Sequence, residues 1–331
     1  MRVCSLPAPP RMAFGAYAQF AFCFPHSYTD TMAKLAWLDS AFGLPPAPVS
    51  AAATVAAPAA VEAEAASSNP AAAALTAALA AAGSPAGESS NPRADQELAN
   101  AAVASAALDA PVALATSAGI YYHRELLTRS LDGRRIDLLT ISSANNMDPA
   151  RDAPLPEITS AGLPTAASEG GERAHAFADK PVFLLTARVH PGESPASHVF
   201  DGLLSFLLST SDPRARALRE AFVFKLVPMI NPDGVYRGHY RADSRGVNLN
   251  RVYGAPSAEE HPAVYAIAAL VRSLHATGAL RFYIDCHAHS NKRGCFLFGN
   301  AISDAEAMAS NVMYAKIVEA NCRWFDFDGC V

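Results

Sequence analysis

The sequence predicts an α/β fold built on a mixed, mostly parallel sheet with helices on both faces. Short continuous apolar runs at 182–185, 222–230 and 280–286 are typical of strands that are buried on both faces. Segments with apolar residues three and four positions apart separate these runs, and this alternation favours helices that cover both sides of the sheet. In such a sheet the functional site lies in the loops that follow the carboxyl ends of the strands.

The composition permits a sizeable core but excludes several classes of protein. Of the 331 residues, 51% are hydrophobic and 17% are charged. Much of the apolar content lies in residues 43–119, which are rich in Ala, Pro and Ser and contain no aromatic residue, so a disordered insertion is predicted there. The formal net charge of −5 offers no overall basic field for nucleic acid, and no apolar run has the composition of a membrane helix.

The elements are expected in the following order. A strand over 16–28, in which Phe alternates with smaller residues, is preferred to a signal peptide. A helix over 29–42 follows, capped by Thr29 or Asp30. Beyond the insertion we expect a hairpin around the Asp132-Gly133 turn signal, a polar loop over 145–180, strands over 182–185, 222–230, 280–286 and 294–298, and helices over 197–208, from 213, over 261–274 and over 304–321.

The six cysteines stand at scattered positions and none lies in a Cys-x-x-Cys pair. This spacing in a long chain favours reduced thiols in a cytosolic protein over a disulfide framework.

Three loops after predicted strands contain the residues that can carry chemistry. His190 and Glu193 form an H-x-x-E pair, and His287 in a later loop could complete a set of two histidines and one glutamate. Three protein ligands and a water are typical of a catalytic zinc site. The alternative for this pair is an ordinary helix start with a glutamate in its first turn.

The second loop suggests an anion pocket. Arg241, Asn250 and Arg251 could bind a carboxylate through charge-assisted hydrogen bonds. The alternative is a basic loop that is merely solvated, and Arg237 in the same loop is expected to be solvated.

Four motifs together, HPGE, NPDG, NLNR and DCHAHS, resemble those of the zinc carboxypeptidases. They are most similar to the cytosolic carboxypeptidases that trim glutamates from tubulin. The resemblance implies a carboxypeptidase-like fold and one Zn²⁺ per chain. By position it implies His190, Glu193 and His287 as zinc ligands, Arg241 as the catalytic arginine that stabilises the oxyanion, Asn250 and Arg251 as the clamp for the substrate's terminal carboxylate, and His289 as a residue that lines the pocket.

Two departures from the family pattern shape our expectations. The general-base glutamate of the family lies beyond the last matching motif, and the glutamates after His287, Glu306 and Glu319, fall in no such motif. The N-terminal β domain of the cytosolic group is represented only by residues 1–28. We therefore expect a catalytic domain that is incomplete at its C-terminus, with residues 29–42 as its first helix and 120–331 as its body, and a chain truncated at both ends.

The resulting functional hypothesis is a zinc metallocarboxypeptidase that removes C-terminal or branch-point glutamates from polyglutamylated protein tails such as those of tubulin. The chain itself is expected to show little turnover. The alternatives are a zinc-binding or tail-binding fragment without activity, and an amide hydrolase acting on small acyl-amino acids, against which the NPDG and NLNR stretches argue. The resemblance places the protein in the cytoplasm, near microtubules or cilia, with no nucleic-acid or membrane partner.

Overall fold

The computed structural model describes residues 25–44, 119–292 and 294–331. The chain divides into two compact units, a first unit that ends at Cys286 and a second unit from His287 to Val331. The predicted strand over 16–28 and the predicted insertion over 43–119 lie almost entirely outside the described residues. The division of the chain into the domains expected above therefore stays a prediction.

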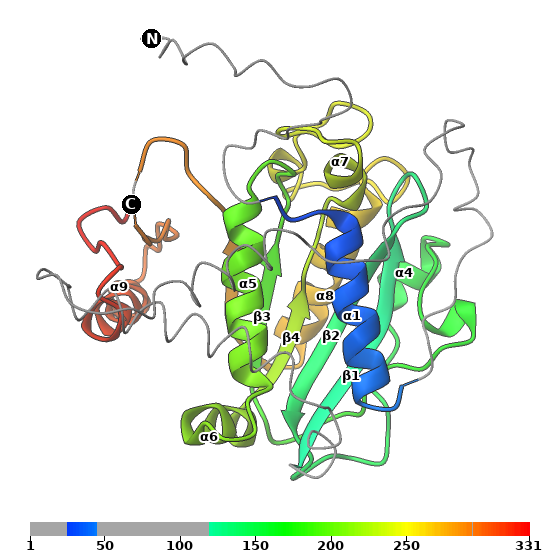
Figure 1. Cartoon of the computed structure of the whole chain (residues 1–331), viewed down its shortest axis with the longest axis horizontal. Coiled ribbons are helices and arrows are strands. Elements are labelled where there is room, and N and C mark those ends of the chain that lie inside the picture. The colour runs from blue at the N-terminus through cyan, green and yellow to red at the C-terminus, as the bar shows by residue number, and fades with distance from the viewer. Residues whose placement is uncertain (1–24, 45–118, 293) are drawn as a thin grey trace, which may run out of the picture. The chain divides into compact units, whose positions relative to one another are not determined.

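The first unit contains a five-stranded sheet with the strand order β1-β2-β4-β3-β5 (Figure 1). The strands are β1 (Ile120–Arg129), β2 (Arg135–Ser143), β3 (Val182–Ala187), β4 (Val223–Val227) and β5 (Leu280–Cys286). The pairs β1–β2 and β2–β4 are antiparallel, whereas β4–β3 and β3–β5 are parallel. The mixed α/β sheet is thus confirmed, with parallel pairing confined to β4, β3 and β5.

The β1–β2 hairpin turns where the Asp-Gly pair predicts it. Gly133 has a φ of +79°, a conformation that glycine adopts without steric cost. Two backbone bonds close the turn, from the N–H of Ser130 to the carbonyl of Arg134 and from the N–H of Gly133 to the carbonyl of Ser130, each 2.9 Å long.

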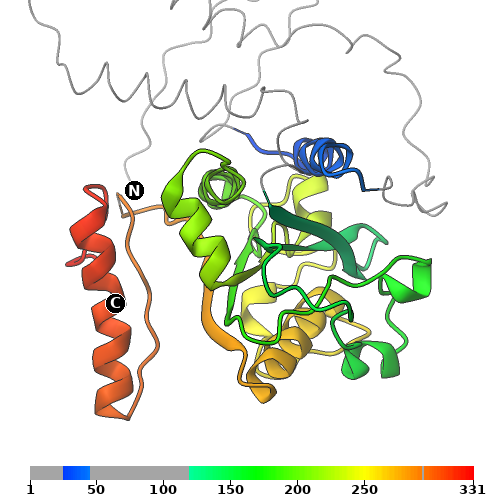
Figure 2. The ribbon, with the colours of Figure 1, turned by 90° about the horizontal axis from the view of Figure 1, so that it is seen from below.

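Helices cover both faces of this sheet, as predicted. The described helices of the first unit are α1 (Tyr28–Ala41), α4 (Pro156–Ser160), α5 (Ser194–Leu207), α6 (Pro213–Ala221), α7 (Pro232–Tyr236) and α8 (Pro262–Ala276). Figures 1 and 2 show α1 and α5 on one side of the sheet and α8 on the other. The buried apolar side chains accordingly form two clusters, one on each face.

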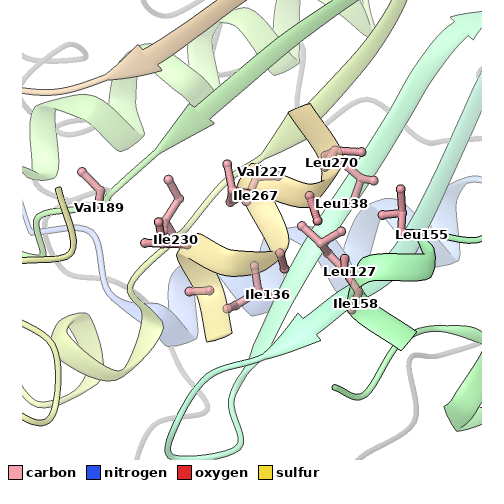
Figure 3. Close-up of a cluster of buried hydrophobic side chains, with 14 of the residues drawn as sticks. Leu127, Ile136, Leu138, Leu155, Ile158, Val189, Val227, Ile230, Ile267 and Leu270 are labelled. Carbon is pink, nitrogen blue, oxygen red and sulfur yellow. The ribbon is translucent and has the colours of Figure 1, made fainter. Parts of the chain in front are cut away.

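The cluster under α8 holds the sheet to this helix and to α4 (Figure 3). Ile267 and Leu270 of α8 meet Val227 and Leu138 of the sheet, and all four side chains are at most 1% exposed. The opposite cluster packs Leu35 and Leu38 of α1, and Phe200, Leu204 and Leu207 of α5, against the other face. Both faces of the central strands are buried, which explains their continuous apolar sequence.

A buried ion-pair network attaches α1 to the sheet. Arg124 of β1 donates to Asp39 of α1 at 2.7 Å and to Asp137 of β2 at 3.0 Å. Arg135 also donates to Asp137, at 2.7 Å. Burial would raise the pKa of the Asp137 carboxyl, but the two guanidinium groups outweigh it and hold this pKa below its usual value.

Three details of the first unit differ from the predictions. Helix α1 is capped by Ser27, because its hydroxyl accepts the N–H of Asp30 while Asp30 accepts the N–H of Ser27. Helix α5 begins three residues earlier than predicted and buries Phe200 in place of Val199, which is 57% exposed. The face that α5 presents to the core is therefore rotated from the predicted one.

The segment 145–180 is more than a polar loop. It contains α4, and its Leu155 and Ile158 belong to the core cluster under α8. Ion pairs connect the segment to the sheet, among them Asp152 with Lys225 and Arg173 with Glu125. The two apolar side chains within a polar stretch gave too short a pattern to reveal this packing.

The second unit contains α9 (Ala305–Asn321), capped by Asp304, whose carboxylate accepts the N–H of Ala307 at 2.7 Å. The predicted strand over 294–298 is wrong for the described residues, because the segment forms only an isolated bridge between Cys295 and Phe325. The described cysteines, Cys286, Cys295, Cys322 and Cys330, are free thiols. Among the described helices, none combines the length and the apolar character that spanning a membrane requires.

Candidate metal centre

The three loops singled out in the sequence follow strands that run in the same direction. The loop 188–193 follows β3, Asn231 and α7 lie just beyond β4, and His287 directly follows Cys286, the last residue of β5. Because β4, β3 and β5 are parallel neighbours, their carboxyl ends share one edge of the sheet. The polar side chains of these loops are thereby concentrated at this edge.

The loop 188–193 is packed closely against the two loops that follow β4. The N–H of Gly192 donates to the carbonyl of Tyr240 at 2.8 Å, and the side chain of Asn231 donates to the carbonyl of Val189 at 3.3 Å. A Cβ atom on Gly192 would lie 2.7 Å from the Tyr240 carbonyl oxygen. Glycine is thus required at this point of the HPGE motif because the two backbones approach so closely.

His190 is buried, with 2% of its surface exposed, and both of its ring nitrogens have polar neighbours. Nδ1 lies 2.8 Å from Oε1 of Glu193, and Nε2 lies 3.0 Å from Oδ1 of Asn248. An amide oxygen can only accept a hydrogen bond, so Nε2 carries a hydrogen atom. The Glu193 carboxylate beside Nδ1 is likewise an acceptor, so a cation would replace the hydrogen atom on Nδ1 and bind there, while the hydrogen atom on Nε2 stays bonded to Asn248.

Asn248 was missed as a site residue by sequence reasoning, which used it only as part of the NLNR motif. Its Oδ1 also accepts the N–H of Asn250 at 3.1 Å, which caps the short 3₁₀ helix Leu249–Arg251. The sequence offered one signal for this role, the Asn-x-Asn spacing. It is typical of a turn in which the first side chain accepts the backbone N–H two residues on.

The predicted ligands are brought together. Donor atoms of His190, Glu193 and His287 all lie within 4.8 Å of one another. Two ligands of one Zn²⁺ are at most about 4.4 Å apart at bond lengths of 2.0–2.2 Å, so small side-chain rotations suffice for all three to reach one ion. Two imidazoles and one carboxylate are a donor set that suits zinc, and three protein ligands leave a coordination position open.

The end of β5 that leads into His287 is fixed to the neighbouring strand. Thr186 of β3 is the register partner of Asp285, and its hydroxyl donates to the Asp285 carboxylate at 2.7 Å. Burial raises the pKa of Tyr283 and that of Cys286 to about 12, so the phenol and the thiol both stay protonated near neutral pH. The Cys286 side chain is partly exposed.

The arginines between β4 and α8 differ from one another in their contacts. Nη1 of Arg241 lies 3.7 Å from Oε1 of Glu193, and its side chain is 43% exposed. Arg251 is exposed and donates to the carbonyl of Asn250 at 3.1 Å. Arg237 is not merely solvated, because it forms an ion pair with Asp132 at 2.8 Å.

The aspartate of the NPDG motif has a structural role that the motif did not reveal. Asp233 is 3% exposed and accepts from the hydroxyl of Ser130 at 2.7 Å, the N–H of Asp132 at 3.0 Å and the guanidinium of Arg134 at 2.9 Å. It thereby attaches the loop after β4 to the β1–β2 turn. His289 belongs to the second unit, where its ring packs against those of Phe296 and Phe298.

The family profile of the zinc carboxypeptidases matches residues 112–291, and the chain belongs to this family. Cytosolic carboxypeptidase-like protein 5 of Danio rerio is 35% identical over 311 residues, which cover 64% of this chain and 34% of the relative. Cytosolic carboxypeptidase 6 of Mus musculus is 37% identical over 209 residues, which cover 62% of this chain and 34% of the relative. The chain thus spans about a third of the length of these curated relatives.

Among solved structures, a metallo-carboxypeptidase from Burkholderia cenocepacia is 27% identical, with a TM-score of 0.48. The match covers 62% of this chain and 47% of that one. Membership of the family rests on the sequence match and not on this structural likeness.

Proposed function

We propose that this chain carries the zinc site and the carboxylate clamp of a cytoplasmic carboxypeptidase that removes C-terminal or branch-point glutamates from acidic protein tails, such as those of tubulin. The observation that carries the proposal is the convergence of His190, Glu193 and His287, all three at the positions expected for zinc ligands. The named cytosolic carboxypeptidases among the relatives support the same activity and compartment.

In this proposal the residues of the chain hold the cation and orient the substrate. His190 offers Nδ1 because Asn248 fixes the hydrogen atom on Nε2. When bound, zinc supplies Lewis acidity toward a carbonyl oxygen and lowers the pKa of water. Arg241, whose guanidinium lies 3.7 Å from Glu193, is proposed to donate to the oxygen on which negative charge develops.

The charge of the loop 237–251 supports an acidic substrate. The loop contains four arginines and one acid, Asp243, in a chain whose net charge is −5. The carboxylate of Asp243 is buried and accepts the N–H groups of Arg245 and Val247, so it does little to neutralise the surface. Arg251 is proposed to bind the terminal carboxylate together with Asn250, and His289 to line the pocket.

The clamp is tested by measuring the affinity of the zinc-loaded protein for a glutamate-ended peptide. Arg251→Ala removes a charge-assisted hydrogen bond, worth about 1.5–3 kcal/mol, and should weaken binding about ten- to hundredfold. Arg245→Ala is the matched control, because Arg245 is exposed in the same loop. It should cost at most about fivefold, as expected for an exposed charge.

A peptide with an amidated C-terminus gives the sharper comparison. It lacks the terminal carboxylate, so Arg251→Ala should change its affinity little. Equal losses for both arginine variants, or for both peptides, would mean a diffuse basic surface and would contradict the clamp.

Activity is tested by glutamate release from a polyglutamylated peptide, with the His190→Ala variant as the control for metal dependence. Release that requires zinc and is lost in the variant would support the enzyme. Because little turnover is expected of the chain itself, zinc and peptide binding without release would agree both with that expectation and with the tail-binding module considered from the sequence.

A further inference from the structure

We propose that Arg188 is a positioning residue that sets the geometry of the two zinc ligands in the HPGE loop. This inference rests on the metal site of the proposed function, to which it adds a supporting residue. Arg188 is the first residue after β3 and stands two positions before His190. It is 2% exposed although it carries a charge.

The backbone of Arg188 is held in a conformation that a side chain disfavours. Its φ is +59°, and Asn146 is the only other non-glycine residue with positive φ in the described parts of the chain. This left-handed conformation is unfavourable for a residue with a Cβ atom, because the Cβ atom crowds the following carbonyl oxygen. Glycine would adopt this conformation without steric cost, but it would lack the contacts that the Arg188 side chain makes.

The guanidinium group of Arg188 folds back over the loop and binds the peptide carbonyl between the two ligands. Nη2 and Nε both donate to the carbonyl oxygen of Pro191, at 2.7 and 3.2 Å. Nη1 donates to the hydroxyl of Ser197 in α5 at 2.8 Å and to the carbonyl of His26 at 3.0 Å. One buried side chain thus joins the loop to α5 and to the segment before α1.

Each of the carbonyls of residues 188–191 accepts a hydrogen bond, and the Arg188 side chain supplies the donor for the last of them. The carbonyls of Arg188 and Val189 accept from the N–H and the side chain of Asn231, and the carbonyl of His190 accepts from the N–H of Glu193. The carbonyl of Pro191 accepts from the Arg188 guanidinium. Since Pro191 is buried, loss of the guanidinium would leave its oxygen without this donor, and the peptide would be free to rotate. Such a rotation would move His190 and Glu193 relative to each other.

The experiment compares zinc affinity in the full chain, by competition with a chromophoric chelator, for the wild type, Arg188→Met and Arg219→Met. Arg219 is the matched control, because it is also 2% exposed and donates to backbone carbonyls, those of Leu207 and Ser209 at the far end of α5. Loss of a residue that orients metal ligands typically costs ten- to hundredfold in metal affinity. We expect that loss for Arg188→Met and less than a threefold change for Arg219→Met in the folded protein.

Circular dichroism establishes that each variant is folded before the titration. If Arg188→Met does not fold, the zinc affinity of Arg188→Lys tests the inference instead. An ammonium group keeps the charge but cannot donate to Pro191, Ser197 and His26 at the same time. We expect a severalfold loss of zinc affinity for this variant. Unchanged affinity in the folded Arg188 variants, or an equal loss in Arg219→Met, would overturn the inference. A wild type that binds no zinc would instead contradict the proposed function.

Discussion

Replacement of Asn248 by alanine should weaken zinc binding without unfolding the protein. Its Oδ1 fixes Nε2 of His190 at 3.0 Å and caps the turn that carries Asn250 at 3.1 Å. Loss of such a partner of a ligating histidine costs ten- to hundredfold in metal affinity, or about 1.4–2.8 kcal/mol. The loss arises because the His190 ring is free to rotate and to place its hydrogen atom on Nδ1.

The assay is a chelator competition at constant pH, combined with peptide binding. Asn250→Ala is the comparison two residues along, and it should leave zinc affinity unchanged but weaken binding of the glutamate-ended peptide. Asn248→Asp should match or exceed the zinc affinity of the wild type, because a carboxylate accepts the Nε2 hydrogen more strongly. A folded Asn248→Ala protein with wild-type zinc affinity would refute the assignment of the tautomer and of Nδ1 as the donor.

The remaining predictions concern the buried network beneath α1. Arg124→Met leaves Asp39 without its guanidinium partner and should lower the free energy of unfolding by about 3–5 kcal/mol, measured by urea titration. The control is Arg272→Met, which breaks the exposed pair with Glu157 and should lower it by at most about 1 kcal/mol. Similar small losses in both would show that the network contributes no more than a surface pair. The lowered pKa of Asp137 means that its stabilising contribution is present above the unfolded-state pKa of about 3.9 and is lost as the pH falls through the folded-state value. Asp137→Asn should therefore show a shallower fall in stability below about pH 4, and an unchanged slope would contradict the linkage.

The sheet could be predicted largely because strands that are buried on both faces have short continuous apolar sequences. Strand β5 is found at the predicted bounds, and the Asp-Gly pair correctly marked the β1–β2 turn. The segment 294–298 shows the limit of this reasoning. A short apolar run indicates burial but does not specify a strand partner, and the described structure supplies only one isolated bridge there.

The convergence of the three candidate ligands could be predicted because their residue types and spacing are specific, whereas the residues that support them could not. The pairing of Arg237 with Asp132 joins residues 105 positions apart, and that of His190 with Asn248 joins residues 58 apart. Nothing in the local sequence of either partner specifies such a contact, since it depends on how the sheet brings the loops together. The left-handed backbone conformation of Arg188 could not be predicted either, because a positive φ is usually expected at glycine.

The attachment of Asp233 to the β1–β2 turn has a consequence for anyone who engineers this protein. By sequence, Leu131-Asp132-Gly133 is an inviting place to insert an epitope tag or a fluorophore, since exposed hairpin turns commonly tolerate insertions. Here the turn supplies a hydroxyl, a backbone N–H and a guanidinium to a carboxylate in the loop that follows β4. An insertion at this turn would therefore disturb a segment packed against the loop that holds His190 and Glu193, and a label placed there would affect the candidate metal site.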